Sequence, residues 1–207
     1  MSTVEVYKPK HHLRFVTASS LFDGHDASIN IMRRIMQSSG VEVIHLGHNR
    51  SVEEVVNAAI QEDVQGIAMS SYQGGHVEYF KYMYDLLKEK GAPHIRIYAG
   101  GGGVIVPREI KELHDYGIAR IFSPEDGREN GLQGMINLML EESDYSTECS
   151  SLQNHIDELR AGNMKTIAQY ITFAENRLEL SEEAAAAAES LLDQIKTSNQ
   201  QVPVVGI

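Results

Sequence analysis

The sequence lacks the features of a secreted, disulfide-bonded or membrane-embedded protein. Its 207 residues include one cysteine, Cys149, which excludes a disulfide within the chain and is typical of a reducing compartment. The opening residues, MSTVEVYKPKHHLRFV, have neither the apolar core nor the cleavage site of a signal peptide. No apolar run approaches the roughly 18 residues that a membrane span needs. We therefore expect a cytoplasmic protein with no membrane partner.

Basic charge is also scarce. The chain has 18 lysines and arginines against 29 aspartates and glutamates, which gives a net charge of −11. No part of it carries the basic face that displaces counterions from a phosphate backbone, so we expect no nucleic-acid partner. The sequence also lacks a Walker A motif, a nucleophile elbow and a zinc-protease motif.

From residue 13 to about 142, short apolar runs rich in β-formers alternate with amphipathic segments of helical length. Ser51 suits a helix N-cap and Pro107 a first helical turn. Five β–α pairs predict an α/β fold: a flavodoxin-like, doubly wound, five-stranded parallel sheet with strand order 2-1-3-4-5. The predicted helices cover residues 26–39, 51–62, 76–90, 107–116 and 127–141.

Beyond residue 142 the alternation stops, and the pattern predicts an all-helical linker over 143–201. One helix is expected around Leu152, Ile156 and Leu159, a second from Met164 to Leu178, and a third in SEEAAAAAESLLDQIK with Ser181 as its cap. This segment either packs on the first domain, 1–142, as a helical hairpin or connects it to another domain. The last residues, VPVVGI (202–207), are typical of the start of a buried strand.

Four unusual stretches follow predicted strands: FDGHDAS (22–28), SSYQGG (70–75), AGGGGV (99–104) and SPEDG (123–127). Because the carboxyl ends of parallel strands lie on one edge of the sheet, these stretches converge where open α/β sheets bind ligands. The convergence predicts a binding site at this edge.

His25 is the candidate metal ligand of that site. Metal-bound imidazoles usually donate their second N–H to a carboxylate, and Asp23 is placed to accept it. The alternative is that Asp23 or Asp26 only caps the following helix, and Asp26 is the nearer of the two. The other histidines show no ligand-like grouping: His11, His12, His45, His48, His76, His94, His114 and His155.

The run Gly100–Gly103 invites a phosphate-loop interpretation, but it lacks the lysine and hydroxyl of such a loop and does not follow the first strand. Glycines in this number favour a backbone that approaches a bulky flat or chain-like ligand. The simpler alternative is a flexible turn.

Together, DGHDAS, SSY and GGGG resemble the cobalamin-binding domain of adenosylcobalamin-dependent acyl-CoA mutases over about residues 13–142. That family has Asp-x-His-x-x-Gly, then Ser-x-Leu, then Gly-Gly. Asp23, His25 and Ser70 match the pattern, as does a pair within Gly100–Gly103. Ser28 stands where glycine is usual and Tyr72 where leucine is common.

The resemblance implies that adenosylcobalamin binds base-off, with His25 as lower axial cobalt ligand and its nucleotide tail between the sheet and the first helix. Asp23 would fix the tautomer of His25, Ser70 would bond the displaced benzimidazole, and Tyr72 would line the slot. No catalytic residue is expected in this chain. The remaining predicted cofactor-binding residues are Gly24, Asp26, Ser28, Gly74, Gly75, Gly100, Gly101, Gly102, Gly103 and Ser123.

The wider stretches 15–56 and 70–87 resemble fused members of this family, which isomerise isobutyryl-CoA and n-butyryl-CoA. There the cobalamin domain is joined through a helical linker to a P-loop GTPase chaperone domain and a substrate-binding barrel. Residues 202–207 would then begin the GTPase domain, and this chain alone would not turn over substrate. The acidic helical segment also offers a surface for a homodimer.

Two other classes compete with this interpretation. A corrinoid methyl-transfer or cobalamin-sensing module can share the signature, but usually has a helical cap before the fold, whereas about a dozen residues precede the first predicted strand here. A receiver domain would need clustered acids after its first strand and a lysine after its fifth, where this sequence has SPEDG.

Overall fold

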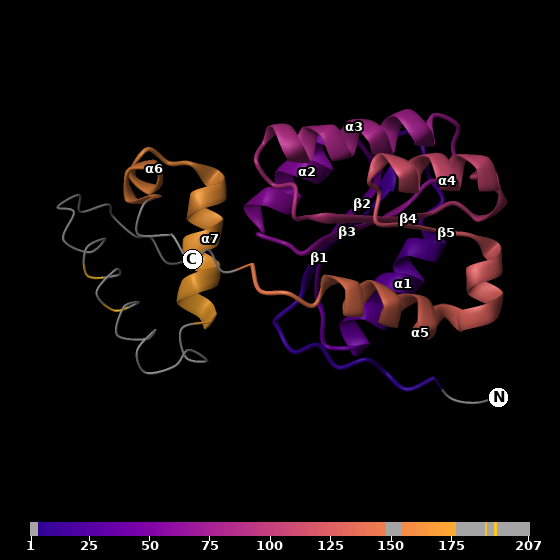
Figure 1. The fold of residues 1–207 in the computed structure, drawn as a ribbon, viewed down its shortest axis with the longest axis horizontal. Coiled ribbons are helices and arrows are strands. Elements are labelled where there is room, and N and C mark those ends of the chain that lie inside the picture. Colours follow the sequence, from indigo (N-terminus) through magenta and orange to yellow (C-terminus); the bar gives the residue numbers. More distant parts are fainter. Residues whose placement is uncertain (1–3, 148–154, 177–188, 190–192, 194–207) are drawn as a thin grey trace. The chain divides into compact units, whose positions relative to one another are not determined.

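The computed structural model describes residues 4–147, 155–176, 189 and 193 (Figure 1). The chain divides into two compact units, residues 1–147 and 148–207. Within the part of the chain that the structure describes, no helix combines the length and apolar character needed to cross a bilayer.

The first unit is a doubly wound α/β fold with five parallel strands in the order β2-β1-β3-β4-β5, which confirms the predicted fold and strand order. Helices α2, α3 and α4 cover one face of the sheet, and α1 and α5 cover the other (Figure 1). The strands are β1 (Arg14–Ser20), β2 (Glu42–Arg50), β3 (Gly66–Ser70), β4 (Arg96–Gly100) and β5 (Arg120–Phe122). The helices are α1 (Ala27–Ser38), α2 (Val52–Gln61), α3 (His76–Glu89), α4 (Pro107–Tyr116) and α5 (Pro124–Ser143).

Alternation along the strands divides the core into two clusters. In β1, Val16 belongs to the cluster under α2–α4, whereas Phe15 belongs to the cluster under α1 and α5. In β4, Ile97 and Tyr98 divide in the same way, because successive side chains of a strand point to opposite faces. On the α1/α5 face β3 contributes only the small Ala68, so less side-chain volume fills this side of the sheet at its centre.

Helix α5 differs from the expectation of residues 127–141. It begins at Pro124, after Ser123, whose Oγ accepts a hydrogen bond from the Asp126 backbone N–H at 3.2 Å, while the Asp126 carboxylate accepts one from the Ser123 N–H at 2.7 Å. This reciprocal cap stabilises an earlier start. The helix is interrupted at Gly131, which has φ 64° and ψ 174°. Only glycine adopts this conformation readily, so the residue permits the break.

The second unit contains α6 (Ile156–Arg160) and α7 (Met164–Asn176). Tyr170 is buried against Ile156, Leu159 and Phe173. The helices expected around Ile156 and from Met164 are therefore confirmed. Other expectations fall outside the described residues: Leu152, Leu178, the capping Ser181, most of the third helix, Cys149 and the segment 202–207.

An N-terminal strap of residues 4–12 is tied to the end of α5. The Asp144 carboxylate accepts hydrogen bonds from the Tyr7 hydroxyl at 2.7 Å, the Lys10 N–H at 2.8 Å and the His11 N–H at 3.0 Å. His11 Nδ1 lies 2.8 Å from the same carboxylate. Burial alone would raise the pKa of Asp144, but these hydrogen bonds lower it to about 2. The charged carboxylate therefore anchors the strap.

Replacing Asp144 with alanine should lower the free energy of unfolding at pH 7 by about 2–3 kcal/mol, because several donors lose a charged acceptor. The pKa of Asp144 is depressed below its ordinary 3.8, so its contribution is fully present above pH 3.8 and is lost as the pH falls through about 2. Urea denaturation at pH 7 and near pH 2 should therefore show that the free energies of unfolding of wild type and variant differ less in acid. Glu129→Ala, at an exposed position on the same helix, is the control. Equal stabilities of D144A and wild type at pH 7 would contradict the anchoring role.

Candidate functional site

The unusual loops of the sequence converge at the carboxyl ends of the central strands. The β1–α1 loop and the β3–α3 loop are joined through Asp23, whose Oδ2 accepts a hydrogen bond from the Tyr72 N–H at 2.6 Å. The β3–α3 loop is joined to the end of β4, where the β4–α4 loop begins, by the hydrogen bond from the Ser71 N–H to the Gly100 carbonyl at 2.9 Å. These bonds bring the three loops into one site.

Asp23 holds His25 by two hydrogen bonds. Its Oδ1 lies 2.8 Å from His25 Nδ1 and accepts a second bond, also 2.8 Å, from the His25 backbone N–H. Burial alone would raise the pKa of Asp23, but the bonds from Tyr72 and His25 lower it below its ordinary value. Because a charged carboxylate only accepts, Nδ1 carries the proton and Nε2 of the neutral ring keeps its lone pair.

His25 offers this lone pair on an open surface. The side chain of His25 is 68% exposed, whereas that of Asp23 is fully buried. Among the described residues, no group of three or more His, Cys, Asp or Glu side chains could hold a metal ion. Within the described part of the chain, His25 Nε2 is thus an exposed lone pair outside any such cluster of side chains.

The start of α1 corrects one expectation. Asp26 occupies the N-cap position, but its side chain makes no capping hydrogen bond, so its predicted capping role is wrong. Asp23 does not cap the helix either, because its oxygens are taken by His25 and Tyr72. In the first turn, Ser28 Oγ is buried and has no hydrogen-bond partner. A buried hydroxyl without a hydrogen-bond partner costs folding free energy, so such groups are uncommon in native proteins.

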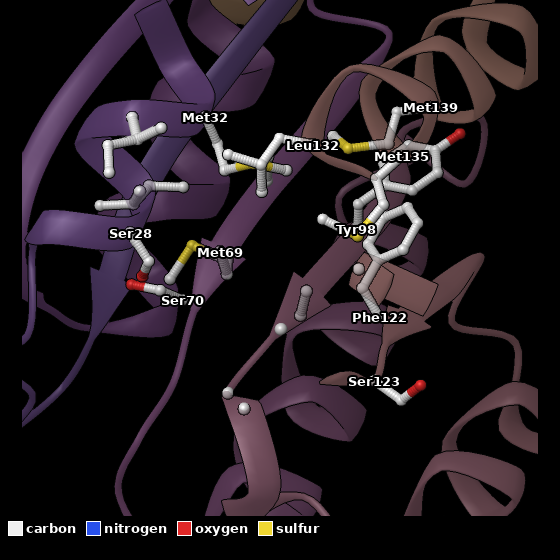
Figure 2. Close-up of a pocket in the computed structure, with 18 of the residues that line it drawn as sticks. Ser28, Met32, Met69, Ser70, Tyr98, Phe122, Ser123, Leu132, Met135 and Met139 are labelled. Atoms are coloured by element: carbon white, nitrogen blue, oxygen red, sulfur yellow. The ribbon is translucent and has the colours of Figure 1, made fainter. Parts of the chain in front are cut away.

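A cavity of about 290 Å³ lies between the sheet, α1 and α5. In Figure 2, side chains of α1, such as Met32, and of α5, such as Met135, approach the cavity from opposite sides. Most of its wall is apolar. Five methionines line it: Met32, Met36, Met69, Met135 and Met139. Pockets lined by apolar side chains with a few polar groups are typical of small-molecule sites.

The predicted site residues divide between this cavity and the loops around it. Those that line the cavity are Ser28, Ser70, Tyr72, Gly100, Gly101, Gly102 and Ser123. Gly24, His25 and Asp26 are exposed in the β1–α1 loop beside the buried Asp23, and Gly74 and Gly75 precede α3. Gly103 is in the 3₁₀ turn Gly102–Val104 and is not among the lining residues.

The four consecutive glycines are not equivalent. A Cβ on Gly101 would lie 1.9 Å from the Ser71 carbonyl oxygen, a distance that no packing allows. Gly102 has φ +56°, and a Cβ there would lie 3.1 Å from the Tyr72 ring. A Cβ on Gly103 would meet nothing within 4 Å. The close approach of the β4–α4 loop to the β3–α3 loop therefore requires glycine at 101, and the run is more than a flexible turn.

The cavity is also lined by residues that were not predicted as site residues. Tyr98, on β4, is buried and its hydroxyl lies 2.9 Å from Ser143 Oγ. Phe122 on β5 and Met135 and Met139 of α5 lie on the same side of the cavity as Tyr98 (Figure 2). Apolar spacing on strands and helices was their only sequence signal, and the same spacing marks ordinary core residues.

Three other histidines of the first unit have structural partners. His76 is buried, and its Nε2 lies 2.9 Å from Glu109 at the start of α4. His45 Nδ1 lies 2.9 Å from the Thr17 hydroxyl, and His114 Nε2 accepts a hydrogen bond from the Ile121 N–H at 2.9 Å. None of these three takes part in a group that could hold a metal ion.

Comparison with known proteins gives consistent matches. A family model described as "B12 binding domain" matches residues 13–127. The fused isobutyryl-CoA mutase of Geobacillus kaustophilus (strain HTA426) is 70% identical over 203 residues, 98% of this chain and 19% of that protein. The fused isobutyryl-CoA mutase of Nocardia farcinica (strain IFM 10152) is 49% identical over 207 residues, 100% of this chain and 18% of that protein.

A solved structure shares the fold. It is a cobalamin-binding protein from Desulfitobacterium hafniense DCB-2, with a TM-score of 0.52 and 20% identity, covering 62% of this chain and 58% of that chain. The chain described here spans about a fifth of the length of the two curated mutases.

Proposed function

Because the chain belongs to the B12-binding domain family, we propose that it binds adenosylcobalamin base-off, with His25 Nε2 as the lower axial ligand of cobalt. The observation that carries the proposal is the bond between His25 Nδ1 and the buried Asp23 at 2.8 Å. It leaves Nε2 as the one ring nitrogen that can bind a metal. An exposed imidazole is accessible to a macrocycle too large to enter the protein.

The cavity fits the displaced nucleotide tail. Its apolar walls suit a flat aromatic base. Ser70 Oγ lies 2.8 Å from Ser19 Oγ and lines the cavity, where it is placed to bond a ring nitrogen. Ser28, which also lines the cavity, has a buried hydroxyl without a protein partner. Both hydroxyls suit a ligand that is mainly apolar but has a few polar atoms.

When bound, adenosylcobalamin supplies a cobalt–carbon bond as a source of radical chemistry. The protein's own residues bind and orient it. His25 donates a lone pair through Nε2, and Asp23 keeps the proton on Nδ1 and strengthens the imidazole as a donor. The glycines at 101 and 102 let the β4–α4 loop lie close to Ser71 and Tyr72, and the apolar walls of the cavity exclude water.

The chain would serve as the cofactor domain of an isobutyryl-CoA mutase. Its identity to two proteins of that name supports this assignment over a methyl-transfer or sensing module. Residues 143–201 would act as a helical linker, and 202–207 as the start of a GTPase domain that precedes the substrate-binding barrel. We expect no isomerisation of isobutyryl-CoA by these 207 residues alone, because the substrate-binding barrel is not among them.

A spectrophotometric titration of the 207-residue chain tests the proposal. Adenosylcobalamin should bind with a base-off, histidine-ligated spectrum. Adenosylcobinamide, which lacks the nucleotide tail, should bind at least about tenfold more weakly because the cavity stays unfilled. A base-on spectrum of the bound cofactor, or no saturable change, would overturn the proposal. Equal affinities for the two ligands would overturn the role of the cavity.

A further inference from the structure

Tyr72 lies where the three loops of the site meet. Its backbone N–H donates to Asp23 at 2.6 Å. Its ring packs on the His25 ring with centroids 5.4 Å apart and a tilt of 43°. The ring also lies near Gly102, where an added Cβ would be 3.1 Å from Tyr72 Cε1. Tyr72 also lines the cavity, so it touches both parts of the proposed cofactor site.

His25 needs a second restraint besides Asp23. Its bond through Nδ1 fixes one edge of the ring, but 68% of the side chain is exposed. A single hydrogen bond to one ring atom leaves the imidazole free to tilt about that bond. The Tyr72 ring lies against the imidazole and limits this tilt, which determines where Nε2 is presented.

We propose that Tyr72 is a positioning residue that couples filling of the cavity to the presentation of His25 Nε2. The inference rests on the proposed function and deepens it. A nucleotide tail in the cavity would pack on the exposed part of the Tyr72 ring and reduce its rotamer freedom. The fixed ring would in turn hold the imidazole. Leucine, which the family commonly has here, can cover the slot but offers no flat ring to the imidazole.

The test uses the 207-residue chain with Tyr72 replaced by phenylalanine, leucine or alanine. Tyr82→Ala is the matched control, because Tyr82 is an exposed tyrosine of α3 outside the site. Adenosylcobalamin and adenosylcobinamide are titrated into each protein, and the spectrum gives both the affinity and the histidine-ligated fraction. Thermal melts identify any variant that does not fold.

In the wild type and in Y72F, the histidine-ligated fraction should be higher with adenosylcobalamin than with adenosylcobinamide. In Y72A, this difference should disappear and the ligated-to-unligated ratio with adenosylcobalamin should fall about 3- to 10-fold, the value of one aromatic contact. Y72L should resemble Y72A. If Y72A does not fold, the test is the comparison of the histidine-ligated fraction in Y72L with that in Y72F. Unchanged ratios in the folded variants would overturn the proposal.

The ligand-free chain provides a second readout. Nuclear magnetic resonance of the His25 ring should show a changed ring-current shift in Y72L and Y72A, and a preserved one in Y72F. If the wild type fails to bind adenosylcobalamin base-off, the proposed function fails, whatever the resonance of His25. If it binds base-off but the His25 signals are the same in Y72A and wild type, only the positioning role of Tyr72 fails.

Discussion

Replacing His25 with alanine is expected to lower the affinity of the chain for adenosylcobalamin by roughly 100-fold or more and to remove the histidine-ligated spectrum. Loss of a partner that merely orients a metal ligand typically costs 10–100-fold, and His25 is the proposed ligand itself. The fold should be unaffected, since the side chain is 68% exposed and its loss opens no core cavity. The measurement is a titration followed by absorbance, with a thermal melt of each protein.

His48→Ala is the matched control for this experiment. His48 is an exposed histidine at the end of β2, and its removal should leave both affinity and spectrum unchanged. If H25A retains the wild-type spectrum with bound adenosylcobalamin, His25 is not the axial ligand. Asp23 would then serve only to stabilise the loop.

Gly101→Ala should have the largest effect on folding. The added Cβ would lie 1.9 Å from the Ser71 carbonyl oxygen, so the backbone of β4 or of the β3–α3 loop must move. We expect a loss of about 3 kcal/mol or more in the free energy of unfolding, at the upper end of overpacking effects. For a chain of this size, such a loss lowers Tm by about 6–12 °C. Binding should weaken as well, because Ser71 precedes the residue that holds Asp23.

Gly103→Ala separates this steric effect from loop flexibility. Its Cβ would meet nothing within 4 Å, so Tm should change little. Calorimetry of both variants gives the comparison. Equal stability of G101A and G103A would mean that the run is a pliable turn after all, and that the close approach at Gly101 does not constrain the fold.

The sequence was sufficient to predict most of the fold of the first unit. Strand order and helix positions followed from alternating apolar runs, because these runs were short, separate and punctuated by residues such as Ser51 and Pro107. The start and the break of α5 were not predictable in this way. Its start depends on a reciprocal bond between Ser123 and Asp126, and its break on the conformation of Gly131. Neither leaves a periodic signal.

The location of the site was predictable from the sequence, but the contacts among its residues were less so. Topology alone brings the β1, β3 and β4 loops to one edge. The pairing of Asp23 with His25 was expected from their spacing, whereas the bond from Tyr72 to Asp23 joins residues 49 positions apart in the sequence. Asp26 was expected to cap α1 because it occupies the right position, but local sequence does not determine where its side chain points. The differences among four identical glycines likewise arise from their neighbours in space.

The sulfur atoms around the cavity give it a chemical sensitivity that leucines would not. Five methionines face the space between the sheet, α1 and α5. Methionine oxidises to a sulfoxide, which is polar and chiral and which reductases can restore. Each such conversion would place a strong dipole in a wall that otherwise excludes water. A sulfoxide in this wall would therefore weaken the binding of an aromatic base.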